Sequence, residues 1–220
     1  MALTKYNYNS FDVTPVASKA LAFNSDADGF TTASEGSMVL IKELTASSDS
    51  TIDFVDGASD VVLDNTYPIY LFKLINIHPS GDDMKIGFQG NAAGESGYNE
   101  TITSAVFLAY HDESDSGTSL TYSTTRDEAQ STDFQDIIDD LGNDNDQSAS
   151  GELWLFNPSS TTFVTHWMSN IQIYNSSNNS VIFRTAGYFN TTAAIDEIQF
   201  KPASGTLDTG TFKLYGIKDS

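Results

Sequence analysis

The sequence predicts an all-β protein: an antiparallel β-sandwich that carries one short helix and is extended by an N-terminal arm. The clearest evidence is the stretch 163–217, where short runs of alternating apolar residues are separated by Asn, Ser, Gly and Pro. Turn signals recur along the chain at the interval typical of a sandwich, and no longer internal repeat indicates a propeller or a solenoid. The 220 residues fit one domain, which at this length needs no disulfide, and Cys is absent.

The first 37 residues differ from the rest of the chain. Residues 1–37 mix polar and apolar side chains, include Pro15 and keep no sustained period. We expect an extended arm that docks on the body or on a neighbouring molecule, and that serves as a candidate anchoring segment. Residues 38–220 are expected to form a single sandwich domain.

Eleven segments of the body have the composition and alternation of strands. They are separated by turn residues such as Asp56-Gly57 and the stretch 78–83. The predicted strands are 38–44, 51–55, 68–77, 84–90, 102–113, 119–124, 151–156, 161–174, 181–189, 194–200 and 211–217. This pattern favours a sandwich of jelly-roll or lectin-like type.

One segment has a helical period. Its apolar residues fall at i, i+3, i+4 and i+7, namely Phe134, Ile137, Ile138 and Leu141. Thr132 and Gln135 have the spacing of a capping box, and Gly142 offers a left-handed stop. We therefore expect a two-turn helix that lies across a sheet edge or a barrel mouth and plugs one end of the core.

The charge of the chain is strongly acidic, with 30 Asp and Glu against 10 Lys and Arg and a net charge of -20. Binding to nucleic acid is disfavoured, because such partners need Lys and Arg to displace counterions. The acidic run 112–146 is interpreted as a solvated rim that keeps the protein soluble, with a dedicated cation site as the alternative. No Sec-type export signal and no membrane anchor are expected.

One segment of the arm matches a calcium-loop pattern. Asn24, Asp26, Asp28 and Glu35 stand at ligand positions 1, 3, 5 and 12, and Gly29 stands at position 6. The flanks show no helical period, so the loop lacks the helices that would preorganise it. A polar turn is the favoured interpretation, calcium binding is the alternative, and no other cofactor is expected.

Catalytic motifs are absent from the sequence. The three histidines, His78, His111 and His166, are far apart and show no metal-binding spacing. The carboxylates single out no acid-base pair, and no nucleophile elbow, phosphate loop or dinucleotide fingerprint occurs. The sequence therefore predicts a non-enzyme.

Two tryptophans are candidate glycan contacts, because an exposed aromatic ring stacks well on a sugar. Trp154 and Trp167 both lie in predicted strands, where alternation sends every second residue inward. Core packing is the favoured interpretation for each, and an exposed sugar platform is the alternative.

Six segments, taken in their order along the chain, carry a resemblance to a known family. They are FDVTPVASKALAFNSDADGF (11–30), YPIYLFKLINIHPS (67–80), AYHDE (109–113), LWLFNPSSTTFV (153–164), AGYFNTTAAIDEIQFK (186–201) and GTLDTGTFKLYGI (205–217). These segments resemble virion structural proteins of tailed phages, particularly those of marine and cyanobacterial hosts. The opening part resembles the attachment arm of fibre-type proteins, and the closing GTFKLYGI resembles the tail of such β-rich proteins.

The resemblance implies a non-enzymatic component of the outer surface of a phage particle, either a capsid decoration or head appendage or part of a tail or fibre. Its expected partners are other virion proteins and further copies of itself, with a trimer favoured. The arm and the sheet edges would make these contacts. Two other functions remain open: a glycan- or receptor-binding module for host attachment, and a glycan-degrading enzyme.

Overall fold

The computed structural model describes residues 21–23, 30–32 and 36–218. All regular secondary structure in these residues is β-strand. The strands are β1 (Leu21–Phe23), β2 (Phe30–Thr32), β3 (Met38–Ala46), β4 (Ile52–Val55), β5 (Ile69–Pro79), β6 (Met84–Ala92), β7 (Ile102–Asp112), β8 (Thr118–Tyr122), β9 (Ala129–Ser131), β10 (Gln135–Leu141), β11 (Ala149–Phe156), β12 (His166–Tyr174), β13 (Asn179–Phe189), β14 (Ile195–Pro202) and β15 (Leu207–Ile217). The prediction of an all-β protein is confirmed.

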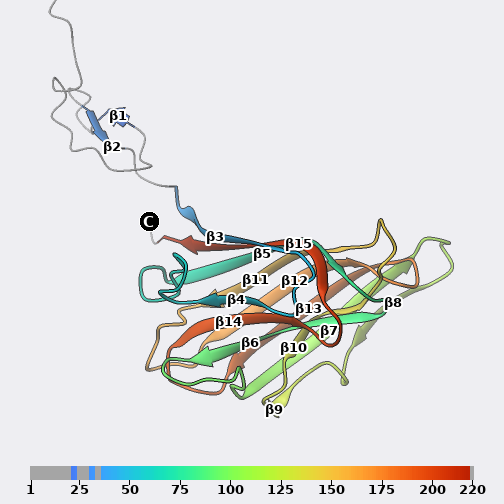
Figure 1. Cartoon of the computed structure of the whole chain (residues 1–220). Helices are drawn as coiled ribbons and strands as arrows, with labels where there is room; N and C mark the ends of the chain where they lie inside the picture. Colours follow the sequence, from blue (N-terminus) through green and yellow to red (C-terminus); the bar gives the residue numbers. More distant parts are fainter. Residues whose placement is uncertain (1–20, 24–29, 33–35, 219–220) are drawn as a thin grey trace, which may run out of the picture.

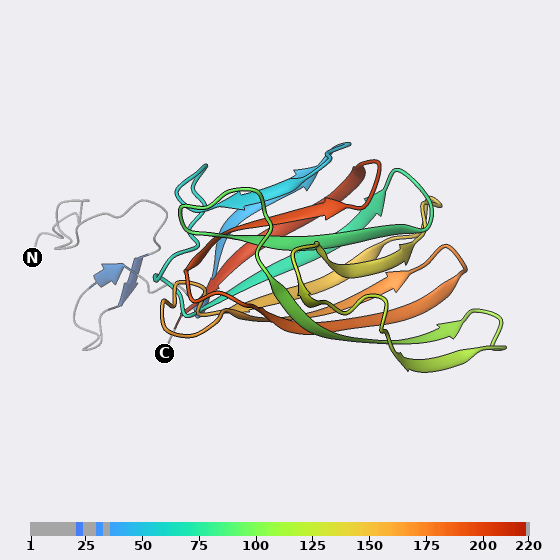
Figure 2. The same cartoon turned by 90° about the horizontal axis from the view of Figure 1, so that it is seen from below.

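The body is a sandwich of two antiparallel sheets (Figure 1). The larger sheet has nine strands in the order β3-β15-β5-β11-β12-β13-β7-β8, with β9 also paired to β7. The smaller sheet has four, in the order β10-β6-β14-β4. The β7–β8 hairpin projects from one end of the sandwich (Figure 2). The predicted antiparallel sandwich is therefore present, and each of the eleven predicted strands has a counterpart in it.

The core lies between the two sheets and is rich in phenylalanine. Phe54 and Phe200 come from the smaller sheet and Phe72 and Phe212 from the larger one, and all four are fully buried. Their ring centroids lie 5.2 Å (Phe54–Phe72), 5.5 Å (Phe72–Phe200) and 5.2 Å (Phe200–Phe212) apart. Burial of each ring stabilises the fold by about 1.5–3 kcal/mol, so this cluster joins the sheets.

The predicted helix is wrong, because its residues form β10, which pairs antiparallel with β6. The register shifts twice, between Asp136 and Ile138 and again between Ile138 and Leu141, and Asp140 has a φ of 53°. Each bulge resets the alternation of side chains, so Ile137, Ile138 and Leu141 are all buried. Two bulges in one strand therefore reproduce the apolar spacing of a helix.

The expected capping residues have other roles. The Gln135 side chain is buried and donates from Nε2 to the backbone oxygens of Arg126 and Asp136, each at 2.9 Å. Gly142 does not have the positive φ of a left-handed helix stop. It leaves space for the Gln147 amide, whose Oε1 would stand 1.7 Å from an added Cβ.

The segment 123–134 covers the outer side of the smaller sheet at β6 and β10. The buried Gln89 of β6 donates from Nε2 to the backbone oxygens of Thr132 and Asp133, at 3.3 and 3.1 Å. Arg126 Nε donates to Asp139 Oδ2 of β10 at 2.7 Å. These contacts close part of that surface to solvent.

The chain enters and leaves the body at one corner. Met38 begins β3 and lies opposite Ile217 at the end of β15, and the Lys218 backbone N–H donates to Ser37 O at 2.8 Å. Before this corner, β1 and β2 form an antiparallel pair in which Phe23 stacks on Phe30, with ring centroids 5.0 Å apart. No helix in the described part of the chain has the length and apolar character to cross a membrane.

Candidate ligand-binding groove on the nine-stranded sheet

The side of the larger sheet that points away from the smaller sheet, here called the outer face, carries a row of apolar residues. Strand alternation and the pairing register place these residues next to one another on six neighbouring strands, from β7 to β15. They are Ala105, Ala186, Met168, Trp154, Leu71 and Tyr215. An outer sheet face that meets only water normally carries polar residues, so this row marks a surface suited to a ligand or partner.

The neighbouring row on the outer face is polar except at its β7 end, where Phe107 stands. Its polar residues are Arg184, Asn170, Glu152, Lys73 and Lys213. Arg184 Nε donates to Asn170 Oδ1 at 3.0 Å, and Lys73 Nζ lies 2.6 Å from Glu152 Oε2. Lys213 Nζ lies 2.9 Å from Glu43 Oε2 on β3. Amide, carboxylate and cationic groups therefore stand beside the apolar row.

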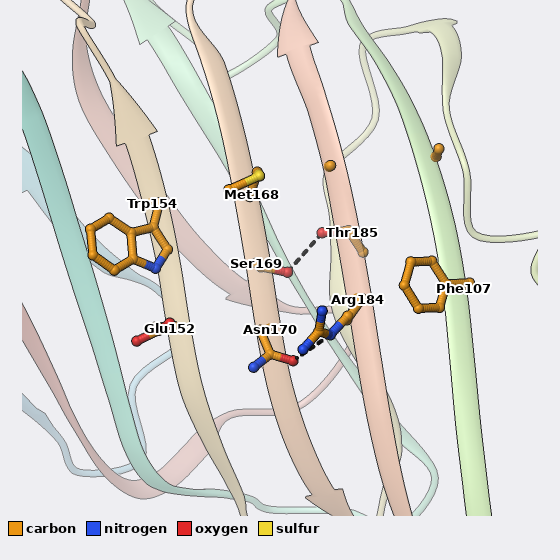
Figure 3. Close-up of a pocket in the computed structure, with 10 residues that line it drawn as sticks. Phe107, Glu152, Trp154, Met168, Ser169, Asn170, Arg184 and Thr185 are labelled. Carbon is orange, nitrogen blue, oxygen red and sulfur yellow. Dashed lines mark hydrogen bonds between the residues drawn. The ribbon is translucent and has the colours of Figure 1, made fainter.

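Three adjoining shallow depressions follow these rows, and together they are called the outer groove. The first, of about 360 Å³, lies between Phe107 and Trp154, with Met168 between them (Figure 3). The second, of about 550 Å³, shares Glu152, Asn170 and Arg184 with the first. The third, of about 450 Å³, adjoins the second at Gln172. A groove that crosses several strands suits an extended ligand better than a compact one.

The Trp154 ring is held against the sheet. Leu71 lies beside Trp154 and Tyr215 on the outer face, yet Leu71 is only 2% exposed. Its two bulky neighbours exclude water from it. Trp154 itself is half-buried, whereas Met168 and Phe107 are 49% and 45% exposed. Trp154 therefore offers a partly exposed aromatic ring whose side-chain motion is restricted by its neighbours.

The other tryptophan is not available to a ligand. Trp167 on β12 is 1% exposed, and its ring meets that of Phe88 at 4.9 Å between the sheets. The core interpretation holds for this residue, because alternation along β12 turns Trp167 inward and Met168 outward. Of the two candidate glycan contacts, only Trp154 lies on the surface.

The charge state of Glu152 follows from its neighbours. Burial raises the pKa of Glu152, but the Lys73 and Trp154 side chains favour the charged carboxylate more strongly, so the net shift of the pKa is downward. Glu152 is thus ionised at neutral pH. In the part of the chain that the structure describes, it is the only carboxylate that lines the first two depressions.

The third depression is more acidic than the other two. Asp112, Glu113 and Asp146 line it, together with His111 and Tyr174. The pKa of Asp112 is lowered, mainly by the Ser116 hydroxyl, which donates to Asp112 Oδ2 at 2.6 Å. A hydrogen bond to Glu113 raises the pKa of Tyr174. This end of the groove offers acceptors for hydroxyl groups.

The histidines do not form a catalytic cluster. His111 Nε2 lies 3.2 Å from Asp115 Oδ1, His78 Nε2 contacts the backbone oxygen of Asp144 at 3.3 Å, and the His166 ring meets that of Tyr188 at 6.1 Å. The described residues contain no group of three His, Asp or Glu that could hold a metal ion. Asn24, Asp26, Asp28 and Glu35, the residues of the calcium pattern, lie outside the described residues.

Comparisons with protein-family models, with curated proteins and with solved structures find no match to this chain.

Sequence reasoning identified Trp154 but missed the residues that surround it. Glu152, Met168, Asn170 and Arg184 come from three different strands. Alternation within the segments 151–156, 161–174 and 181–189 predicts which residues of each strand share a face. It does not predict the register between strands, and the register is what assembles the groove.

Proposed function

We propose that the chain is a non-enzymatic component of the outer surface of a tailed-phage particle and that it binds a glycan in the outer groove. Glycan binding is the part that the geometry supports. The location on a virion is supported by the resemblance of the segments quoted above. The two parts are tested separately.

The position of Trp154 is the observation that carries glycan binding. A sugar ring has one apolar face and a rim of hydroxyl groups, so its site needs an aromatic or apolar surface beside hydrogen-bonding groups. Trp154 and Met168 supply the apolar surface, and Glu152, Asn170 and Arg184 supply the polar groups within the same depression. The shallow, open form of the groove suits a chain of sugars.

Binding without hydrolysis is favoured by the carboxylates. Glycoside hydrolysis generally needs two carboxyl groups on opposite sides of the scissile bond, one of them with a raised pKa. Among the described residues, Glu152 is the only carboxylate that lines the first two depressions, and its pKa is lowered. This argument favours a binding module over a glycosidase.

The proposed fold type is a jelly-roll or lectin-like sandwich, a finer class than the antiparallel sandwich described above. Both types place ligand sites on sheet faces or in the loops between strands.

The strongly acidic composition suits a protein that is displayed at high local density on a particle, because like charges discourage aggregation of particles. Cryo-electron microscopy of intact particles tests the proposed location on the outer surface. The absence of density for this chain anywhere on the particle would reject that location.

A glycan array with the full chain tests binding. We expect the wild-type chain to bind a subset of oligosaccharides, and Trp154→Ala to abolish that binding. Phe163→Ala is the matched control, because Phe163 is another exposed aromatic residue, at 71%, and does not line the groove. Equal binding by wild type and Trp154→Ala, or equal losses in the two variants, would reject the groove as the site.

A purely structural role is the second candidate, and the β3 edge of the larger sheet, which pairs with no further strand among the described residues, favours it. β3 ends the strand order of this sheet, and its Met38 and Leu40 are 51% and 48% exposed. An open edge with apolar side chains is suited to contact with another molecule. Homo-oligomers, with a trimer favoured, and attachment through residues 1–37 belong to this proposal. Light scattering of the full chain and of a chain without residues 1–37 tests it, and two monomeric species would count against it.

A further inference from the structure

We propose that the glycan held in the outer groove carries a carboxylate and that the guanidinium of Arg184 binds it. This inference rests on the glycan-binding function proposed above and names the class of sugar: an oligosaccharide that contains an acidic residue such as a uronic acid.

Arg184 has an unused set of donors. A guanidinium carries five N–H donors, and in the described part of the chain Arg184 makes one side-chain hydrogen bond, from Nε to Asn170 Oδ1 at 3.0 Å. The other two cations of the polar row are paired, Lys73 with Glu152 and Lys213 with Glu43. Arg184 is therefore the cation of this row that has no carboxylate among the described residues.

The single bond that Arg184 makes fixes its orientation. Because Nε is held by Asn170, the terminal nitrogens of the guanidinium remain free to donate (Figure 3). A guanidinium binds a carboxylate through two parallel hydrogen bonds, and this geometry is stronger than a single neutral bond. Asn170 accepts through Oδ1, so its Nδ2 is a further donor next to the same position.

The surroundings of Arg184 strengthen such a pair. Phe107 is its cross-strand neighbour on β7, and Met168 and Ala186 of the apolar row line the same depression. A ligand seated on these apolar side chains would displace water from the guanidinium. Electrostatic attraction is stronger where water is excluded, so the carboxylate contact gains from this position.

The distance between the anchors sets the length of the ligand. Arg184 lies on β13 and Trp154 on β11, two strands apart, which corresponds to about 10 Å across the sheet. One sugar ring does not span this distance. The ligand that uses both anchors is therefore an oligosaccharide, with its carboxylate at Arg184 and another ring on Trp154.

The acidity of the whole chain does not exclude an acidic ligand. The net charge of -20 repels anions at long range, but at 0.1 M salt the repulsion from charges farther than about 10 Å away is largely screened. Arg184 is exposed in the free chain, but a ligand seated on Phe107 and Met168 would cover the contact, so salt would weaken this short-range pair less than the long-range repulsion. We expect the affinity for an acidic oligosaccharide to stay constant or to rise as salt is added. An anion that binds a positively charged surface shows the opposite dependence, because its affinity falls as salt is added.

Calorimetry with uronic-acid trisaccharides, oligogalacturonate and oligoglucuronate, and with their methyl esters tests the proposal. The ester keeps the sugar but removes the charge. We expect the wild-type chain to bind at least one acid form tenfold or more tighter than its ester. Arg184→Gln should abolish this preference, Arg184→Lys should restore it only in part, and Lys213→Gln should keep it. Lys213→Gln is the matched control, because it removes one positive charge from the same row.

Three results would overturn the inference. They are equal affinity of the wild-type chain for every acid and its ester, an unchanged preference in Arg184→Gln, and binding of neutral glycans alone. If neutral glycans bind and Trp154→Ala abolishes their binding, the proposed function stands and only the carboxylate is rejected. If no glycan of either kind binds, both proposals fail.

Discussion

The ammonium nitrogen of Lys73 lies 2.6 Å from Oε2 of Glu152, on the neighbouring strand of the outer face. This pair has a consequence for the groove. It occupies Glu152, the carboxylate that lines the depression beside Trp154, and so it leaves Arg184 bonded to Asn170 but without a carboxylate partner among the described residues. Partly exposed pairs of this kind contribute at most about 1 kcal/mol to stability, so the significance of the pair lies in how it arranges the groove.

We expect the two tryptophans to respond differently to a quencher in solution. Trp154 is half-buried on the outer face and Trp167 is 1% exposed in the core. Acrylamide, which is neutral and is not repelled by the acidic chain, should quench part of the wild-type fluorescence. Trp154→Phe should lose that accessible part. Strong quenching that persists in Trp154→Phe would contradict the burial of Trp167.

The stability of the fold should change with the charge on Asp136. Burial, together with repulsion from Asp139, outweighs the nearby charges of Lys85 and Arg126 and raises the pKa of Asp136 to about 6 from 3.8. The folded chain thus holds this proton more tightly than the unfolded chain. Asp136 therefore favours folding below about pH 4, and that contribution is lost as the pH rises through about 6.

Asp136→Asn should remove this dependence on pH. The free energy of unfolding of the variant, relative to wild type, should rise by on the order of 2 kcal/mol between pH 4 and pH 7. Urea denaturation at several pH values measures it. Asp60→Asn is the control, because Asp60 is exposed and removal of its charge should leave the profile nearly unchanged. Parallel profiles for wild type and Asp136→Asn would contradict the assignment.

Loss of Arg126 should loosen the segment 123–134. Arg126 Nε lies 2.7 Å from Asp139 Oδ2 and 3.8 Å from Asp136 Oδ2. Arg126→Gln leaves the largely buried Asp139 carboxylate without its cation and leaves Asp136 with Lys85 alone, 3.6 Å away, which we expect to cost about 2–3 kcal/mol. Hydrogen exchange should become faster in 123–134 and in β10 while β11 and β12 stay protected. Unchanged exchange in 123–134 would contradict this role.

Gly187 should not tolerate a side chain. An added Cβ would lie 2.5 Å from Thr103 O and 2.7 Å from Cζ2 of Trp167. Gly187→Ala is expected to lower the free energy of unfolding by about 1–3 kcal/mol, because neither the neighbouring strand nor the buried ring can move freely. Gly36→Ala, whose Cβ would meet only Met38 O at 4.0 Å, should change it by less than about 0.5 kcal/mol. Equal effects of the two changes in urea denaturation would contradict the packing.

The sandwich was predictable because most strands keep an undisturbed alternation. β12 is the clearest case: its inward residues are buried and its outward residues are exposed from His166 to Ile173. β10 was not predictable, because two register shifts place consecutive apolar residues on the core side. Bulges depend on the partner strand, and a single segment carries no sign of them.

The groove was predictable only at one residue. Trp154 was identified by its type, whereas Phe107, Glu152 and Arg184 became neighbours through pairings between segments far apart in the chain. The register of those pairings is set by the packing of the whole core. No local pattern in the sequence encodes it.

The structure of the chain with the tightest-binding oligosaccharide from the array tests the central claim most directly. We predict a sugar ring on Trp154 and the ligand extending across Met168 and Asn170 to Arg184. A sugar bound at the β3 edge, in the loops at either end of the sandwich, or against the smaller sheet would contradict the outer groove as the binding site.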